Sequence, residues 1–359
     1  MKILLVGEFS GFYNSLKEGL KELGHDAVLA SMGDGFKSLP SDILWDSRFS
    51  GYWGVLERSI KAVKTRAFLK GYDVVQFVSP LIFLLRFGFN KFMINEIINN
   101  NERSFLTIAA DFIDGWNYWK NPLENNVKYS WLPDHIKYDL NGVLPNTLKN
   151  KYYVEWEKNM MLKMDGIIPV MYEYSVPYRK YPNLRQTLPL PINTHKIKYF
   201  NNNVSKKIIV FHGLNRYGFK GTRFVEKAFE ILNKKYPNDL ELIIDGKLPY
   251  NKYIELLSRA NIVIDQTNSY SLGMNALIAM AMGKVVLGGA EPESIKEMGY
   301  NYCPAINIIP NEKDIVSKIE MLLDQRKDIT DIGFRSRKFI EEYHDFIKVA
   351  KQYIKIWKD

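Results

Sequence analysis

The sequence contains very little cysteine and no long uninterrupted apolar run. Its 359 residues include one cysteine, Cys303, which excludes an internal disulfide framework. The longest apolar stretch, around 78–89, is interrupted by Pro80, Arg86 and Gly88 and is too short to cross a bilayer. The chain opens on a buried-strand pattern rather than on a charged segment, an apolar run and a cleavage site. We therefore expect a cytoplasmic protein.

Metal-binding patterns are also missing from the sequence. No Asp-x-Asp pair occurs, and the histidines are dispersed without the spacing of a zinc site; they are His25, His135, His195, His212 and His344. His212 alone stands at an expected strand end near loop cations, which makes it the histidine to test. We expect no metal and no other cofactor.

The composition is that of an ordinary globular protein with an excess of basic residues. With 46% hydrophobic and 25% charged residues, the chain is long enough for two cores of usual size. The formal net charge of +9 suits nucleic acid, anionic lipid headgroups or phosphorylated ligands equally well. Net charge alone does not distinguish these three kinds of ligand. Nothing in the sequence besides this charge favours nucleic-acid modification.

Short apolar runs alternate with longer amphipathic segments along the whole chain, the pattern of parallel sheets covered on both faces. In the first half we expect strands at 2–6, 26–30, 73–78, 105–109 and 166–170, with helices at 14–23, 55–70, 82–100 and 147–164. In the second half we expect strands at 207–211, 241–245, 261–265, 285–288 and 305–308, with helices at 222–235, 250–259, 273–282, 291–298, 311–325 and 336–356. The fold class is therefore α/β, with two Rossmann-like doubly wound domains facing each other across a cleft.

Two segments of the first half depart from this pattern. Residues 111–146 are rich in Trp, Tyr, Asn and Pro and lack clear periodicity, so they predict either a ligand-holding insertion or a packed lid. Residues 58–70, RSIKAVKTRAFLK, combine apolar and basic positions as a helix at a membrane surface does. An ordinary surface helix is the alternative, and association with the inner face of a membrane stays open.

The clearest chemical signal comes from two segments of the second half. Residues 208–232 read IIVFHGLNRYGFKGTRFVEKAFEIL, a strand, a basic loop and an amphipathic helix. Residues 263–287 read VIDQTNSYSLGMNALIAMAMGKVVL, a strand, a polar loop, a helix opened by Gly273 and another strand. A leaving diphosphate must be stabilised, and Arg216, Lys220 and the amides of this second helix could do so without a metal.

These segments resemble the donor domain of GT-B glycosyltransferases, especially the retaining family 4. The resemblance rests on FKGT before an amphipathic helix and on SLGMNALIAMAMGKVV, and it extends in order to MKILLVGEFSGF, to LPLPINTH at 188–195 and to the terminal IGFRSRKFIEEYHDFIKVAKQYIKIW. It implies an acceptor-side domain at 1–190 and a nucleotide-sugar donor domain at 196–335. The final helix, within 336–359, would pack back on the first domain.

The resemblance assigns roles to individual residues. Lys220 and Arg216 would stabilise the donor diphosphate, and Asp111 would orient a sugar hydroxyl, these three forming the catalytic set. The donor would be held by Gly213, Lys247, Leu248, Tyr253, Ser269, Ser271, Gly273, Met274 and Asn275. The acceptor side would include Gly7, Ser10, Gly11 and Asp114.

The chain departs from the resembled family at two positions. The family places a glutamate before the glycine turn and a second one eight residues later, where this chain has Tyr270 and Ile278. The second glutamate holds the nucleotide ribose, and isoleucine cannot accept a hydrogen bond. Either Asn275 or another group takes over, or the nucleotide is held differently, or activity is lost.

The resemblance implies a retaining, metal-independent hexosyl- or related glycosyltransferase. It would move a sugar from a nucleotide-diphosphate-sugar to a saccharide or lipid-linked acceptor, in the synthesis of a surface polysaccharide or glycoconjugate. A GT-B-like binding or partner subunit without turnover is the alternative favoured by Tyr270 and Ile278. A sugar-nucleotide epimerase is a third hypothesis, although the acidic and histidine groups it needs near the sugar are not found.

Overall fold

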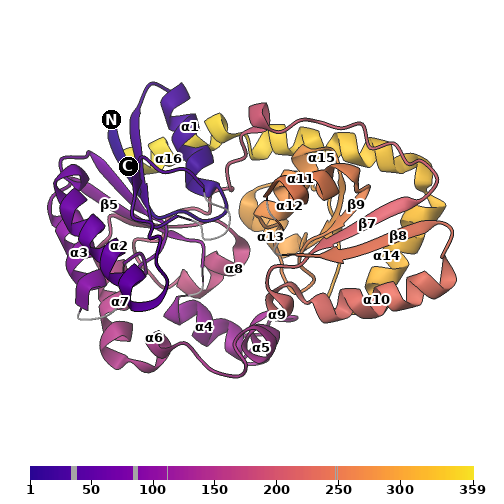
Figure 1. The fold of residues 1–359 in the computed structure, drawn as a ribbon, viewed down its shortest axis with the longest axis horizontal. Coiled ribbons are helices and arrows are strands. Elements are labelled where there is room, and N and C mark those ends of the chain that lie inside the picture. Colours follow the sequence, from indigo (N-terminus) through magenta and orange to yellow (C-terminus); the bar gives the residue numbers. More distant parts are fainter. Residues whose placement is uncertain (34–38, 84–87, 111, 247, 249) are drawn as a thin grey trace.

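The computed structural model describes residues 1–33, 39–83, 88–110, 112–246, 248 and 250–359. The chain forms two α/β domains that lie side by side, each built around a parallel sheet with helices on both faces (Figure 1). Asp111 and Lys247, both expected at the site, lie outside the described residues.

The first domain is built on a six-stranded parallel sheet with the order β3-β2-β1-β4-β5-β6. Its strands are β1 (Lys2–Val6), β2 (Asp26–Ser31), β3 (Ile43–Leu44), β4 (Val74–Phe77), β5 (Arg103–Ile108) and β6 (Gly166–Pro169). The central strands are buried and mainly apolar, as strands covered on both faces are. The strand order reverses at β1, so the connections after β1 and β4 leave on opposite faces and open a crevice at the carboxyl ends of the strands.

The main helices of the first domain follow the amphipathic segments. They are α1 (Phe12–Glu22), α2 (Gly51–Thr65), α3 (Phe89–Asn99), α7 (Lys151–Lys163) and the short α8 (Tyr172–Ser175), with a 3-10 turn at Arg66–Leu69 after α2. The predicted helix at 147–164 is divided into α6 (Asn146–Lys149) and α7. Asn150 divides it because its side chain accepts from the amides of Tyr152 and Tyr153 and caps the second piece.

The second domain has a five-stranded parallel sheet with the order β11-β10-β9-β7-β8. Its strands are β7 (Ile208–Gly213), β8 (Leu240–Asp245), β9 (Ile262–Ile264), β10 (Val285–Gly288) and β11 (Ile306–Asn307). Its helices are α9 (Tyr217–Lys220), α10 (Thr222–Lys235), α11 (Tyr250–Arg259), α12 (Met274–Ala281), α13 (Pro292–Met298) and α14 (Glu312–Asp324). The order reverses between β7 and β9, so the loops after these two strands face the cleft. Both sheets confirm the predicted doubly wound α/β class.

The chain ends in two helices where one was predicted at 336–356. These are α15 (Ile329–Tyr343) and α16 (Phe346–Lys358), which run from the second domain across to the first (Figure 1). Asp345 separates them because its carboxylate caps α16 through the amides of Ile347 and Lys348. α16 packs on α1, and Trp357 donates to Gln76 of β4 at 2.9 Å. The prediction of one helix at 336–356 was therefore wrong, because the chain breaks at Asp345.

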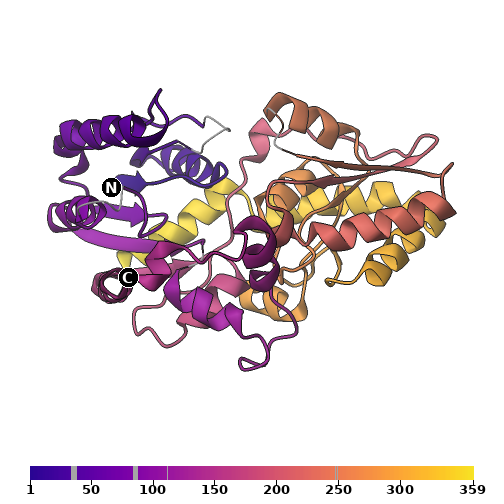
Figure 2. The same cartoon turned by 60° about the horizontal axis from the view of Figure 1, so that its bottom comes forward.

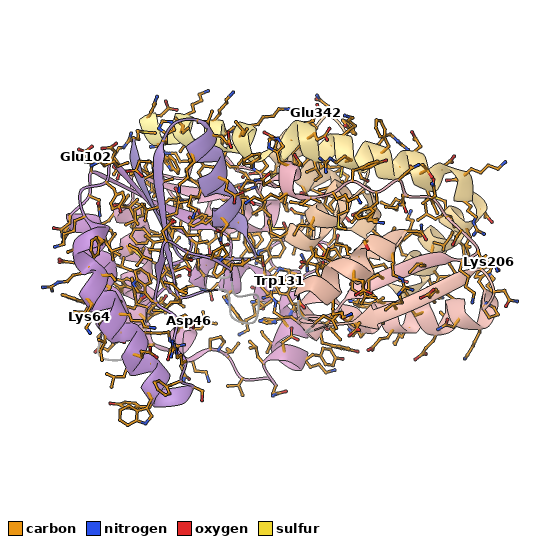
Figure 3. The ribbon with its side chains drawn as sticks, turned by 45° about the horizontal axis from the view of Figure 1, so that its top comes forward. Asp46, Lys64, Glu102, Trp131, Lys206 and Glu342 are labelled. Carbon is orange, nitrogen blue, oxygen red and sulfur yellow. The ribbon has the colours of Figure 1, made fainter. Side chains whose placement is uncertain are left out.

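In its described part, the irregular segment predicted at 111–146 folds into short helices. They are α4 (Ile113–Lys120), α5 (Leu132–Asp134), a π-turn at His135–Asp139 and α6. Figure 2 shows this segment, in magenta, reaching the second domain. Trp131, labelled between the domains in Figure 3, has its ring 4.9 Å from that of Phe219. The segment thus packs as an interdomain lid, and Trp131 also lines the larger cleft pocket.

Of the helices in the part of the chain that the structure describes, none combines the length and apolar character needed to cross a bilayer.

Candidate ligand site in the interdomain cleft

Two adjoining pockets lie in the cleft, where loops at the carboxyl ends of both sheets meet. The larger has a volume of about 540 Å³ and the smaller about 290 Å³. They share four lining residues, Ser10 from the first domain and Asn215, Met274 and Asn275 from the second. A ligand with two chemically different ends could occupy both pockets at once.

Lys220 lies in the larger pocket at the end of α9, where its side chain is almost fully buried. Its Nζ lies 3.2 Å from Oδ1 of Asp265, and only 7% of Lys220 is exposed. The other oxygen of Asp265 accepts from the amide of Gly273 at 3.3 Å. A single carboxylate therefore contacts both the cation and the helix-start amide that were expected to meet a diphosphate. The site is built for negative charge at this point.

Arg216 immediately precedes α9 and borders the same pocket. Its guanidinium carbon lies 3.6 Å from the centre of the Phe219 ring, a cation–π contact that fixes the side chain. Arg216 is exposed, whereas Lys220 is buried. Lys220 is thus the better preorganised of the two predicted cations, and Arg216 can approach a ligand from the cleft mouth.

His212 lies at the end of β7, behind the loop that carries Arg216 and Lys220, and lines neither pocket. Its ring donates from Nδ1 to the carbonyl of Ile264 at 2.9 Å, so Nε2 accepts from the hydroxyl of Thr222, also at 2.9 Å. Complete burial, reinforced by the charge of Lys220, lowers the pKa of His212 to about 4. A neutral imidazole therefore ties β7 to β9 and to the start of α10.

The lid segment holds α9 in place from the first domain. Asp139 accepts from the amides of Gly218 and Phe219 at 3.0 and 2.8 Å. Burial would raise the pKa of Asp139, but these amides and His135 hold it below its usual value. A Cβ on Gly218 would lie 2.1 Å from the carbonyl oxygen of Asp134, so only glycine permits this approach. The loop carrying Lys220 is therefore fixed by both domains.

Ser269 and Ser271 are engaged by a carboxylate from the first domain, Glu173 of α8. Glu173 Oε1 accepts from the Ser269 hydroxyl at 2.5 Å and from the amides of Tyr270 and Ser271 at 2.6 and 2.8 Å. Its Oε2 accepts from the Ser271 hydroxyl at 2.5 Å. Ser269 lines the larger pocket, whereas Ser271 reaches neither cleft pocket. Both hydroxyls serve the contact between the domains in this structure.

Tyr270 is buried in an aromatic cluster rather than in the cleft. Its ring stacks on that of Tyr172 at 5.2 Å, and its hydroxyl accepts from the amide of Lys128 at 2.8 Å. The position that resembles the family's first glutamate is therefore part of the packing between the domains. The carboxylate of Glu173 accepts a hydrogen bond from the backbone amide of Tyr270.

The smaller pocket has a largely apolar wall at the second domain. Leu248, Tyr253 and Ile278 line it together with Gly213 at the end of β7. Ile278 is half-buried, so its side chain occupies part of this wall. The predicted residues for the nucleobase and ribose, apart from Lys247, are thus brought together. The pocket has an apolar side chain at position 278, and its carboxylates come from Glu18 and Asp245 instead.

The predicted acceptor-side residues separate into two groups. Ser10 and Gly11 line the cleft, although the Gly11 amide already donates to Glu8 at 3.0 Å. Gly7 lines neither pocket; it has a φ of +93°, and a Cβ there would lie 2.3 Å from Val78. Asp114 is also away from both pockets, buried against the hydroxyl of Tyr181 at 2.6 Å and Lys180 at 3.0 Å. Gly7 and Asp114 therefore make contacts within the first domain and do not line the cleft pockets.

Among the residues that line the larger pocket without having been predicted, four carry amide or carboxylate side chains. They are Asn215, Gln266, Asp265 and Glu173. The first three could have been found, because they follow the carboxyl ends of β7 and β9. Glu173 carries no such signal, since it comes from the other domain. Within the described residues, no three His, Cys, Asp or Glu side chains are grouped as a metal ligand set.

Comparisons with known proteins give matches in structure alone. No protein-family profile and no curated protein sequence matches the chain. Anabaena HepE in complex with UDP and glucose superposes with a TM-score of 0.64 at 13% identity, over 100% of both chains. Sucrose-phosphate synthase from Thermosynechococcus elongatus gives 0.63 at 12% identity over 100% of this chain and 98% of the other. A Rickettsia africae glycosyltransferase gives 0.58 at 15%, over 99% and 97%. The chain has the GT-B fold of these glycosyltransferases.

Proposed function

We propose that the protein is a retaining, metal-independent glycosyltransferase that uses a nucleotide-diphosphate-sugar as donor. The observation that carries this proposal is the meeting of Lys220 and the amino end of α12 in the larger pocket, around the single carboxylate of Asp265. A donor diphosphate would take over these contacts, with Arg216 beside it. HepE, which has a similar fold, was crystallised with UDP-glucose, which supports this class of donor.

In the proposed reaction, the bond between the anomeric carbon of the sugar and the departing phosphate oxygen breaks. The acceptor hydroxyl oxygen bonds to the same face of that carbon, and its proton passes to the departing phosphate oxygen. No protein base is needed for this proton transfer. Lys220, Arg216 and the α12 amides stabilise the negative charge that develops on the diphosphate.

The two pockets divide the donor between them in this proposal. The nucleoside packs in the smaller pocket against Leu248 and Tyr253, and the sugar lies in the larger one near Ser10 and Asn275. Asp111, which lies outside the described residues, remains our proposal for orienting a sugar hydroxyl. Met274 and Asn275 lie where the two pockets join, next to the expected diphosphate.

Introducing a carboxylate at position 278, in a pocket that Glu18 and Asp245 already line, tests where the ribose lies. Ile278→Glu is expected to tighten nucleotide binding about tenfold, since a charged acceptor adds about 1.5 kcal/mol to a hydroxyl hydrogen bond. Isothermal titration with the free nucleotide diphosphate measures the change. Ile278→Gln, which has similar size without the charge, should gain less. Weaker binding by a folded Ile278→Glu variant would show that the ribose lies elsewhere.

A binding or partner subunit without turnover is the second candidate. It is favoured by Tyr270, whose side chain serves the packing between the domains, and by Ile278 in the smaller pocket. Such a protein would bind a sugar nucleotide and release no product. The distinction therefore requires binding and turnover to be measured on the same sample.

Titration of the purified protein with UDP-, GDP- and ADP-linked sugars, with magnesium and with EDTA, tests the proposal. We expect one nucleotide to bind equally well in both conditions and its sugar to be hydrolysed or transferred. Binding without hydrolysis or transfer to any offered acceptor would favour the second candidate. Binding that requires magnesium would contradict metal independence.

We further propose a saccharide or lipid-linked acceptor, used in building a surface polysaccharide or glycoconjugate on the cytoplasmic side of the membrane. A cleft between two domains suits a large acceptor. Transfer assays with soluble oligosaccharides and with a lipid-linked sugar in detergent separate the two acceptor types.

A further inference from the structure

Helix α2 presents an apolar face to the outside of the molecule. Tyr52, Trp53, Leu56, Ile60 and Val63 are all exposed, with 61% of Tyr52 and 67% of Trp53 accessible. At about 100° per residue, these five positions fall within an arc of about 100° on the helix. Only Gly54 and Ala62 of α2 are buried, and they lie on the opposite side. The helix thus packs by its small residues and leaves its large apolar residues outside.

An exposed phenylalanine also flanks the helix at each end. Phe49 precedes α2 with 61% of its surface exposed, and Phe68 follows it with 67% exposed. The rings of Tyr52 and Trp53 lie 5.7 Å apart, nearly perpendicular, so the aromatic end is a packed pair. We define the α2 face as Phe49, Tyr52, Trp53, Leu56, Ile60, Val63 and Phe68. An apolar surface of this extent indicates a binding partner.

Basic side chains border the α2 face. Residues 48–70 contain six Lys and Arg residues and one acidic residue, Glu57. Arg48, Lys64, Arg66 and Lys70 are exposed, although Lys70 is paired with Glu96 at 2.7 Å. Figure 3 labels Lys64 on α2, along the edge of the first domain that lies away from the second. The partner therefore meets large apolar side chains with the exposed cations Arg48, Lys64 and Arg66 nearby.

We propose that the α2 face binds the surface of a membrane containing anionic lipids. Trp and Tyr suit the boundary between headgroups and acyl chains, and the basic border matches anionic headgroups. A second copy of this face would place like charges against each other, so charge complementarity disfavours a dimer. Membrane binding by the α2 face does not depend on the proposed function; if both hold, the glycosyl transfer takes place at the membrane surface.

Co-sedimentation of the full-length protein with vesicles tests the proposal without any sugar nucleotide. The protein is expected to bind vesicles of equal parts phosphatidylcholine and phosphatidylglycerol, and to bind pure phosphatidylcholine much more weakly. The double variant Trp53→Ser, Ile60→Ser should lose at least about tenfold in affinity, because it removes apolar area that enters the lipid. Lys64→Gln with Arg66→Gln should lose about tenfold and reduce the salt dependence.

Matched changes on other exposed apolar residues provide the control. Tyr152→Ser and Phe334→Ser remove exposed aromatic rings outside the α2 face and should leave vesicle binding unchanged. Equal binding by wild type and the Trp53, Ile60 variant, or no binding to anionic vesicles, would overturn the proposal. Concentration-dependent dimers that the same variant abolishes, seen by sedimentation velocity, would overturn it in favour of a second copy. None of these results depends on whether the cleft binds a donor.

Discussion

Replacing Lys220 by alanine is expected to weaken binding of the nucleotide diphosphate about a hundredfold, a loss of about 3 kcal/mol. The variant removes a buried ammonium group and leaves the Asp265 carboxylate without its cation beside the phosphates. Repulsion from that carboxylate adds to the lost attraction. Isothermal titration of the purified variant with the nucleotide selected by the wild type measures the effect.

Two further variants make this result specific to the pocket. Lys227→Ala removes an exposed lysine of α10 and should leave the affinity unchanged. Asp265→Asn should change the affinity in the opposite direction, because it removes the negative charge that now occupies the Lys220 and Gly273 contacts. Circular dichroism of each variant establishes that it is folded. An unchanged affinity in folded Lys220→Ala would remove this residue from the site.

Replacing Glu173 by alanine is expected to loosen the contact between the two domains. Glu173 has only 3% of its surface exposed and accepts four hydrogen bonds from residues 269–271. Its loss leaves buried donors unpaired, which should lower the free energy of unfolding by about 3 kcal/mol. Because these contacts cross the cleft, we also expect a larger radius of gyration in solution scattering.

Glu173→Gln provides the graded control for this effect. The amide keeps one acceptor oxygen for the two backbone amides and loses the second acceptor for the Ser271 hydroxyl, so its effect should be intermediate. Glu230→Ala, on the exposed side of α10, should change neither stability nor scattering. Unchanged stability and an unchanged radius of gyration in Glu173→Ala would show that this contact does not hold the domains together.

Apolar strands and amphipathic helices of the two domains could be predicted because their periodicity is local. The helix predicted at 222–235 has these same bounds in the structure. β3 (Ile43–Leu44) was not predicted, since a two-residue edge strand has no repeat to detect. The breaks at Asn150 and Asp345 had a visible signal, a capping side chain within a helical pattern. Each break was missed because the apolar repeat continues on both sides of the capping residue and favours one long helix.

The candidate site was predictable where it follows a strand and unpredictable where the other domain contributes. Lys220 and Gly273 follow β7 and β9, so topology alone brings them to the cleft. Ser271 and Asp114 were also near strand ends, yet their partners are Glu173 and Tyr181. A sequence motif gives a residue's place along the chain and not its hydrogen-bond partner. Contacts between distant segments therefore required the structure.

A crystal structure with the bound nucleotide-diphosphate-sugar would show whether protein cations and helix amides hold the diphosphate in the cleft. We predict a phosphate oxygen within hydrogen-bond distance of Lys220 Nζ at the amino end of α12, with the nucleoside against Leu248 and Tyr253. A ligand bound outside the cleft, or a diphosphate held by magnesium and not by Lys220, would exclude this mode of diphosphate binding.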